Sequence, residues 1–148
     1  MKNFHFSLET VMSYKQQILE NAREEVALVT RRLDQVIQEE GQKQRDYDEK
    51  KRHFMETQQA GTTPQMMMYC NNFLYELREE QKALAVKRKA LQKEHSAAIE
   101  RLTNIKIEAS ALEKLQHKEL RQYKAEAAKE EERLVEEFVV HEQLVQGR

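Results

Sequence analysis

The chain has 148 residues, of which 34% are charged and only 7% are aromatic, and it contains no Trp. So little apolar material excludes the compact core on which most enzymes depend. The 25 Lys and Arg residues nearly cancel the 26 Asp and Glu residues, which argues against a general nucleic-acid binder, because such a protein must neutralise many phosphates. The composition favours a protein whose partners are other proteins.

Residues that interrupt helices are scarce, and they cluster. The chain has three Gly residues and one Pro, and the stretch 60–64 holds both Gly61 and Pro64. On either side of this stretch little stops a long helix. We therefore expect an all-α fold, a long two-helix antiparallel coiled-coil hairpin that forms one domain over residues 1–148, with helices over 3–59 and 65–146 and a turn over 60–64.

The first expected helix carries one apolar face. Its apolar residues recur at steps of three and four or their sum, which places them on one side of a helix. Toward the turn the same face becomes polar, with Lys43 and Lys50 among its members, so we expect looser packing there. The apolar members are Phe4, Leu8, Val11, Ile18, Ala22, Val26, Val29, Leu33 and Val36.

The second helix is expected to start after Thr63. Its hydroxyl can accept a free amide of the first turn, and Pro64 at the next position has no amide hydrogen to leave unsatisfied. Two seven-residue series follow, and the wholly apolar one predicts the seam against the first helix. That series is Leu77, Leu84, Leu91, Ala98, Ile105 and Leu112, and the mixed series is Leu74, Gln81, Arg88, His95, Leu102, Ala109 and Gln116.

The two expected helices differ in length, since residues 3–59 number 57 and residues 65–146 number 82. With the turn near Thr62, Phe4 is expected near Leu120, which leaves about 25 residues of the second helix without a partner in the chain. A stripe of Leu134, Phe138, His141 and Val145 continues there. An uncovered apolar stripe favours an interaction surface.

Charge also changes along the second helix. Residues 78–124 include 12 basic and 7 acidic side chains, whereas residues 126–148 include 3 basic and 7 acidic ones. The two segments suit different partners, and the alternative is that both are solvated faces of one helix.

The sequence offers no chemistry of its own. It lacks the glycine-rich loop that holds nucleotide phosphates, and pairs such as Glu113 with His117 supply only two metal ligands. Cys70 has no nearby His to activate it, and a lone cysteine without a secretory signal indicates a reducing cytoplasm. No apolar run approaches the ~20 residues that cross a bilayer. We expect a non-enzymatic protein with no cofactor, no metal ion and no membrane insertion.

Three motifs occur in order along the chain. The first is the aromatic and leucine opening, Phe4-x-Phe6-x-Leu8. The second, over residues 66–77, has a tyrosine, an amide pair and then Phe73-x-x-x-Leu77. The third, over residues 112–137, has a leucine pair and later Glu136-Glu137. Together they resemble the FliJ family of flagellar export proteins over nearly the whole length, although that family usually has an aspartate in the last acidic pair.

This resemblance implies a coiled-coil stalk similar to the rotor (gamma) subunit of rotary ATPases, acting in the flagellar type III export apparatus. Such a stalk would link a ring-shaped export ATPase (FliI) to the cytoplasmic domain of the membrane export gate (FlhA), and it would escort export chaperones. It would work in the cytoplasm, peripherally associated with the cytoplasmic face of the cell membrane, in support of flagellum assembly and motility.

The resemblance also implies where these partners bind. It places gate contact at Tyr69, Phe73 and Leu77, and contact with the ATPase ring at Phe4, Leu8, Leu134, Phe138 and Val145. Phe73 is next to the seam residue Leu74, so we expect it to point outward. Leu77 falls on the seam itself, where packing against the first helix is the alternative to partner contact.

Two other functions stay open at this point. A self-associating scaffold would use Val26, Leu33 and Leu91 to join two copies rather than the two arms of one chain. The equivalent stalk of a virulence-type secretion system would share the architecture and differ in its partners.

Overall fold

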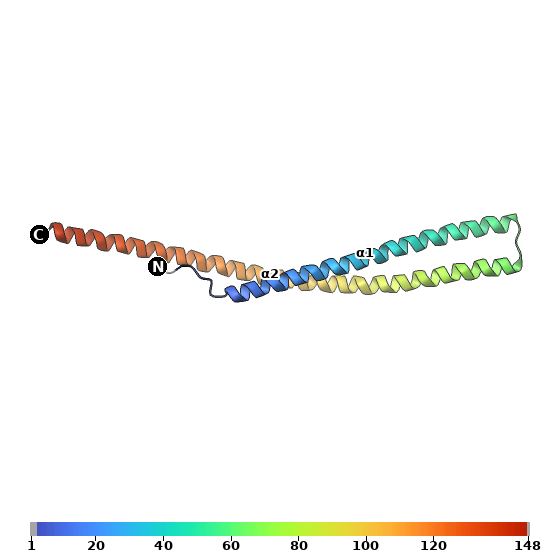
Figure 1. The fold of residues 1–148 in the computed structure, drawn as a ribbon, viewed down its shortest axis with the longest axis horizontal. Coiled ribbons are helices and arrows are strands. Elements are labelled where there is room, and N and C mark those ends of the chain that lie inside the picture. The colour runs from blue at the N-terminus through green and yellow to red at the C-terminus, as the bar shows by residue number, and fades with distance from the viewer. Residues whose placement is uncertain (1–2, 148) are drawn as a thin grey trace. The chain divides into compact units, whose positions relative to one another are not determined.

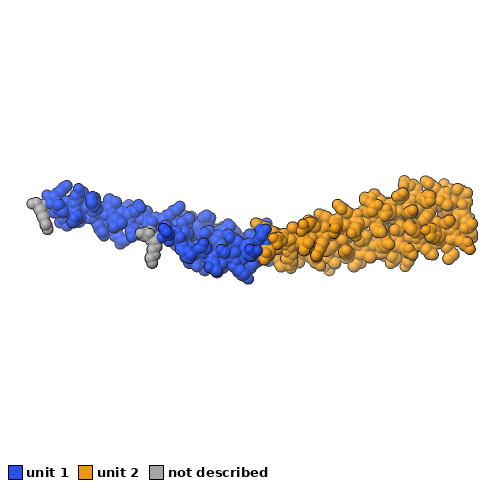
Figure 2. All heavy atoms as spheres, viewed as in Figure 1, with its two compact units in different colours: residues 1–20, 103–148 blue, residues 21–102 orange. Residues whose placement is uncertain are grey.

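The computed structural model describes residues 3–147 and consists of two long helices, α1 (Glu9–Ala60) and α2 (Pro64–Gln146). The helices run antiparallel and pack against each other (Figure 1), which confirms the expected all-α hairpin. Within it the chain forms two compact units (Figure 2). Unit 1 contains residues 3–20 and 103–147 of the described chain, and unit 2 contains residues 21–102.

The turn between the helices depends on a glycine and a threonine cap. Gly61 has a φ of 108°, a backbone conformation that residues with a Cβ rarely adopt. The Thr63 hydroxyl accepts a hydrogen bond from the amide of Met66 at 3.2 Å, and Pro64 is the first residue of α2. The cap therefore has the geometry that the sequence indicates.

The seam of unit 2 follows a seven-residue repeat on both helices. On α1 the buried residues are Ala22, Val29 and Val36. On α2 they lie seven or fourteen positions apart, as a two-stranded coiled coil requires. These α2 residues are Cys70, Leu77, Leu91 and Ala98.

Polar contacts between the two arms of unit 2 establish its register. His95 Nε2 lies 3.1 Å from Thr30 Oγ1, and Gln81 Nε2 donates to Gln44 Oε1 at 3.0 Å. The residue numbers in both pairs add to 125, so the arms pair symmetrically about a turn close to Thr62. One chain thus fills its own seam, including Leu91, with its two arms.

Residues 3–8 do not continue the first helix, which begins at Glu9 rather than at residue 3 as expected. The side chain of Phe6 is only 2% exposed. Both the amide and the hydroxyl of Ser7 donate to the Glu119 carboxylate, at 3.2 and 2.6 Å. These bonds compete with helical ones, because a serine can satisfy the backbone in non-helical ways. We call residues 3–8 the N-terminal strap.

The strap marks the end of pairing within unit 1. The ring of Phe4 packs on that of Tyr123 with centroids 5.5 Å apart, close to the expected position at Leu120. Lys15 forms an ion pair with Glu108, and Ala109 is buried. Beyond this region every α2 residue from 131 to 146 is exposed.

A stability prediction follows from the seam of unit 2. Replacing Val36, which is 2% exposed, with Ala removes two buried methyl groups and is expected to lower the free energy of unfolding by about 2 kcal/mol. Its neighbour Ile37 is 47% exposed, so Ile37→Ala is expected to change that free energy by less than about 0.5 kcal/mol. Urea unfolding followed by circular dichroism compares the two; equal losses would contradict the seam assignment.

The strap gives a second stability prediction. Phe6→Ala removes a buried ring and is expected to destabilise the chain by about 3 kcal/mol. His5→Ala is the control, because His5 is exposed and its Nδ1 only approaches the exposed Glu9 carboxylate, at 3.2 Å. Thermal unfolding measures both variants. If Phe6→Ala and wild type have the same melting temperature, packing of the strap against α2 does not stabilise the chain.

Candidate partner-binding surfaces

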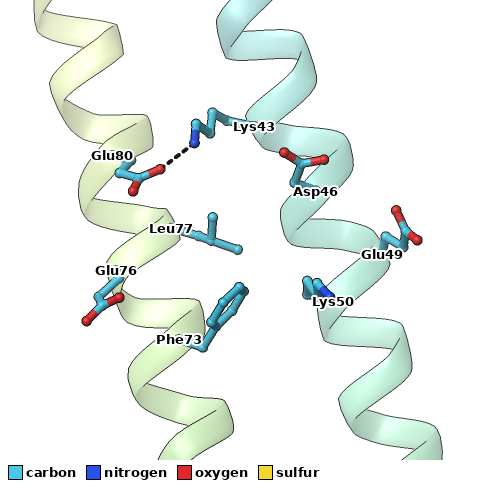
Figure 3. Close-up of a pocket in the computed structure, with 8 residues that line it drawn as sticks. All are labelled: Lys43, Asp46, Glu49, Lys50, Phe73, Glu76, Leu77 and Glu80. Atoms are coloured by element: carbon cyan, nitrogen blue, oxygen red, sulfur yellow. Dashed lines mark ion pairs between the residues drawn. The ribbon is translucent and has the colours of Figure 1, made fainter.

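Leu77 lies in the seam of unit 2. It is 9% exposed, and its side chain points from α2 toward α1 (Figure 3). Of the two interpretations left open by the sequence, packing against the first helix is the one that the structure shows. Partner contact through Leu77 remains a prediction, and it requires access from between the arms.

Phe73 also faces α1, so the expectation that it points outward is wrong. Its ring meets that of Phe54 edge-on, with centroids 5.9 Å apart, and Lys50 Nζ lies 5.9 Å from the centre of the same ring. The reason is its position relative to the seam. Because Cys70 and Leu77 are both buried, the residues three and four positions after Cys70 both border the interface.

Exposed apolar side chains gather on α2 beside the turn. Tyr69 is 59% exposed, so a partner could reach its ring, and gate contact there remains a prediction. The three methionines that precede it, Met66, Met67 and Met68, are also exposed. Sequence reasoning included them in a motif but gave them no role. Met66 and Met68 fall outside both seven-residue series, whereas Met67 lies seven positions before Leu74 and is still 42% exposed.

A hollow of about 460 Å³ opens between the arms next to Phe73 and Leu77. On one side, Lys43 forms an ion pair with Glu80 across the seam at 2.6 Å. The hydrogen bond and the charge of Glu80 raise the pKa of Lys43 above its ordinary value of 10.5. The contribution of the charged Lys43 to this pair is therefore present at neutral pH and is lost as the pH rises above 10.5.

A cation also covers an aromatic ring between the arms of unit 2. The Arg78 guanidinium carbon lies 3.9 Å from the centre of the Tyr47 ring, a favourable cation–π geometry. Tyr47 and Arg78 therefore tie the arms together in the same region as the hollow.

In unit 1, the residues expected to contact the ATPase ring fall into two groups. Phe4 is half-buried against Tyr123, and Leu8 is 37% exposed at the end of the strap. Leu134, Phe138 and Val145 lie farther along α2, where no residue of α1 covers them, and are 59%, 65% and 59% exposed. The structure thus does not bring Phe4 and Leu8 together with the other three.

The exposed end of α2, residues 131–147, is what we call the overhang. At 100° per residue, Leu134, Phe138 and Val145 share one face of this helix. Four more exposed apolar residues lie on its other faces: Val135, Val139, Val140 and Leu144. Sequence reasoning found only the first stripe. The apolar side chains of the overhang are instead spread over several faces of the helix, interleaved with charged and polar ones.

Neither a metal site nor a membrane span is apparent in the part of the chain that the structure describes. Within residues 3–147, no three His, Cys, Asp or Glu side chains are grouped so that they could hold a metal ion. Over the same residues, neither helix has a stretch long and apolar enough to cross a membrane.

Comparison with known proteins identifies the family. A family model described as flagellar FliJ protein matches residues 4–148. Comparisons with curated proteins and with solved structures gave no match. The family match covers all but the first three residues, and it agrees with a structure built from two packed helices. The chain therefore belongs to the FliJ family, whose members are non-catalytic components of the flagellar type III export apparatus.

Proposed function

We propose that this chain is the stalk that links the export ATPase ring to the membrane export gate, and that it does so without bond chemistry of its own. The observation that carries the proposal is the overhang: over residues 131–147 every side chain is exposed, including seven large apolar ones. Exposed apolar surface on this scale marks an interaction site.

The arrangement of the overhang supports a ring as its partner. A helix that is apolar on one face suits a groove, whereas a helix with apolar side chains on several faces suits a partner that contacts it from several sides. Phe138 and Val140 point to different sides of the helix, and both are more than half exposed. The central opening of an ATPase ring would cover them all.

The proposed stalk acts by binding some states of the ring better than others. A bound helix shifts a conformational equilibrium only if its contacts differ between the states. An asymmetric helix inside a ring of similar subunits meets this condition, because each subunit faces a different side of it. Coupling between ATPase and gate then requires only that the same chain binds both.

At the other partner, the exposed aromatic Tyr69 and the half-buried Phe73 are the residues proposed to meet the gate. Leu77 is packed in the seam next to these two residues, where it would contribute to the same contact surface. We also propose that the chain works in the cytoplasm at the cytoplasmic face of the membrane, where gate and ATPase meet, that it escorts export chaperones, and that it supports flagellum assembly and motility.

A self-associating scaffold is the competing function. Because the seam is filled by the two arms of one chain, two copies would have to join through the overhang. Light scattering of the purified chain at micromolar concentration separates the two functions. A monomer supports the stalk, and a stable dimer that dissociates on truncation after Ala125 supports the scaffold.

The ring contact can be tested with paired substitutions in the overhang. Leu134→Ala with Phe138→Ala is expected to weaken binding to the purified export ATPase by about tenfold or more, because such apolar side chains would be buried at the interface. Glu136→Ala with Glu137→Ala changes exposed acidic residues in the same stretch and is the control. Titration of the ATPase measures both; equal affinities for wild type and the apolar double variant would refute the site.

The gate contact has its own matched pair. Phe73→Ala is expected to weaken binding to the cytoplasmic domain of the gate by about tenfold, whereas Tyr75→Ala, which alters a 64% exposed ring two positions away, is expected to have little effect. Leu77 is left intact, since its truncation would also damage the seam. If Tyr75→Ala weakens binding and Phe73→Ala does not, the gate meets the opposite face of α2.

A further inference from the structure

In unit 2, the face of α2 opposite the seam carries large apolar side chains that stay exposed. Met68, Tyr75 and Val86 are 66%, 64% and 70% exposed. Each lies nine positions along α2 from a residue of the seam series, Leu77 or Leu84. At 100° per residue, nine positions amount to about two and a half turns, so these side chains project away from α1.

Lysines share this outer face. Lys82, Lys89 and Lys93 are exposed, and each of them also lies nine positions from a residue of the same seam series. Together with the apolar side chains they follow steps of three, four and seven, which is the spacing of a coiled-coil contact. We call these six residues the outer stripe: Met68, Tyr75, Lys82, Val86, Lys89 and Lys93.

The positive charge of the outer stripe is only partly compensated. Residues 82–93 include five basic side chains and no acidic one. Lys82 forms an ion pair with Glu79 on the same helix, at 3.1 Å. Within the described chain, Lys89 and Lys93 have no ion-pair partner. The stripe therefore attracts acidic groups from outside the chain.

A hollow of about 530 Å³ adjoins the two unpaired lysines. Lys89 and Lys93 line it together with the small side chains of Ser96 and Ala97. All of its lining residues belong to α2 and are exposed, so this hollow is separate from the seam. Because small side chains let a second helix approach closely, the hollow has room for a side chain of a partner.

The spacing of the apolar side chains favours a helical partner. Tyr75 and Val86 are 11 positions apart, which corresponds to about 16 Å along the helix axis. A second helix that runs beside α2 contacts residues at steps of three, four and seven along one line. A nucleic acid would neutralise the lysines through its phosphates but would gain little from these apolar side chains.

We infer that the outer stripe is a docking site for an acidic amphipathic helix of a partner protein. The apolar face of that helix packs on Tyr75 and Val86, and Asp or Glu residues beside this face pair with Lys89 and Lys93. Charge complementarity of this kind orients a partner and excludes basic competitors. The inference is independent of the proposed function, because the stripe lies on the side of α2 opposite Phe73.

Synthetic peptides of about three heptads are the probes. The acidic amphipathic peptide has Leu at the first and fourth positions of each heptad and Glu at the flanking positions. The second peptide keeps Glu but has Ser in place of Leu, and a short duplex DNA is the third probe. The full chain is expected to bind the first peptide at least about tenfold more tightly than the second. No binding of the first peptide, or tighter binding of the DNA, would overturn the inference.

Charge reversals test the lysines of the stripe. Lys82→Glu with Lys89→Glu and Lys93→Glu is expected to bind the acidic amphipathic peptide at least about tenfold more weakly than wild type. The difference is expected to shrink as added salt screens the charges. Circular dichroism checks that the variant keeps its helicity.

The matched control for charge lies on α1 in the same unit. Arg31→Glu with Arg32→Glu and Arg52→Glu reverses three exposed basic residues outside the stripe. It changes the net charge as much as the stripe variant does, so any long-range attraction changes by a similar amount. Its affinity for the peptide is expected to stay within about threefold of wild type. Equal weakening by the two triple variants, or weakening by neither, would refute the docking site.

A second pair of variants tests the apolar contact separately from charge. Tyr75→Ala with Val86→Ala is expected to weaken binding of the acidic amphipathic peptide about tenfold at every salt concentration. Leu28→Ala with Ile37→Ala alters side chains of α1 that are 42% and 47% exposed, and it is expected to stay within about twofold of wild type. If the stripe variant binds the peptide as tightly as wild type, no apolar face packs on the stripe and the inference is wrong.

Discussion

The apolar seam between the two arms is the contact on which the rest of the structure depends. A two-helix hairpin has no second layer, so only the residues on one stripe of each helix can leave water. In unit 2 the most buried are Val36 at 2% and Ala98 at 1% exposed. Among the described residues, no polar or charged side chain is buried. Burial of this narrow stripe must therefore offset the entropy lost in ordering both helices.

Polar side chains at the edge of the seam hold the arms in register. The Thr30 hydroxyl donates to the Val26 carbonyl at 2.7 Å, so its oxygen accepts from His95 Nε2. Nearby, Arg88 donates to Glu40 at 2.8 Å. Polar residues at such positions stabilise a coiled coil less than leucine would, but they favour one alignment over others. Because α1 and α2 can slide past each other within unit 2 only by breaking these contacts, the contacts favour one register of the arms in this unit.

Local sequence signals were sufficient for the helices and the turn. Gly61, Thr63 and Pro64 specify the turn and lie within a few residues of each other. The seven-residue repeat of Leu77, Leu91 and Ala98 predicts a helix that packs on any second helix with a matching apolar stripe. The strap could not be predicted in this way. Whether Ser7 continues a helix or turns away depends on Glu119, which is 112 positions distant. The spacing of Phe4 and Leu8 fits a helix equally well, and the pattern therefore predicted one.

The orientation of Phe73, at a candidate site, could not be predicted from local sequence either. A residue next to a seam position can lie on either side of it, and the choice depends on which of two seven-residue series packs deeper. Cys70 and Leu77 do so in unit 2, so Phe73 borders α1, whereas Ala109 of the other series is the buried α2 residue in unit 1. An aromatic held partly inside the seam has less apolar area to offer a partner from outside.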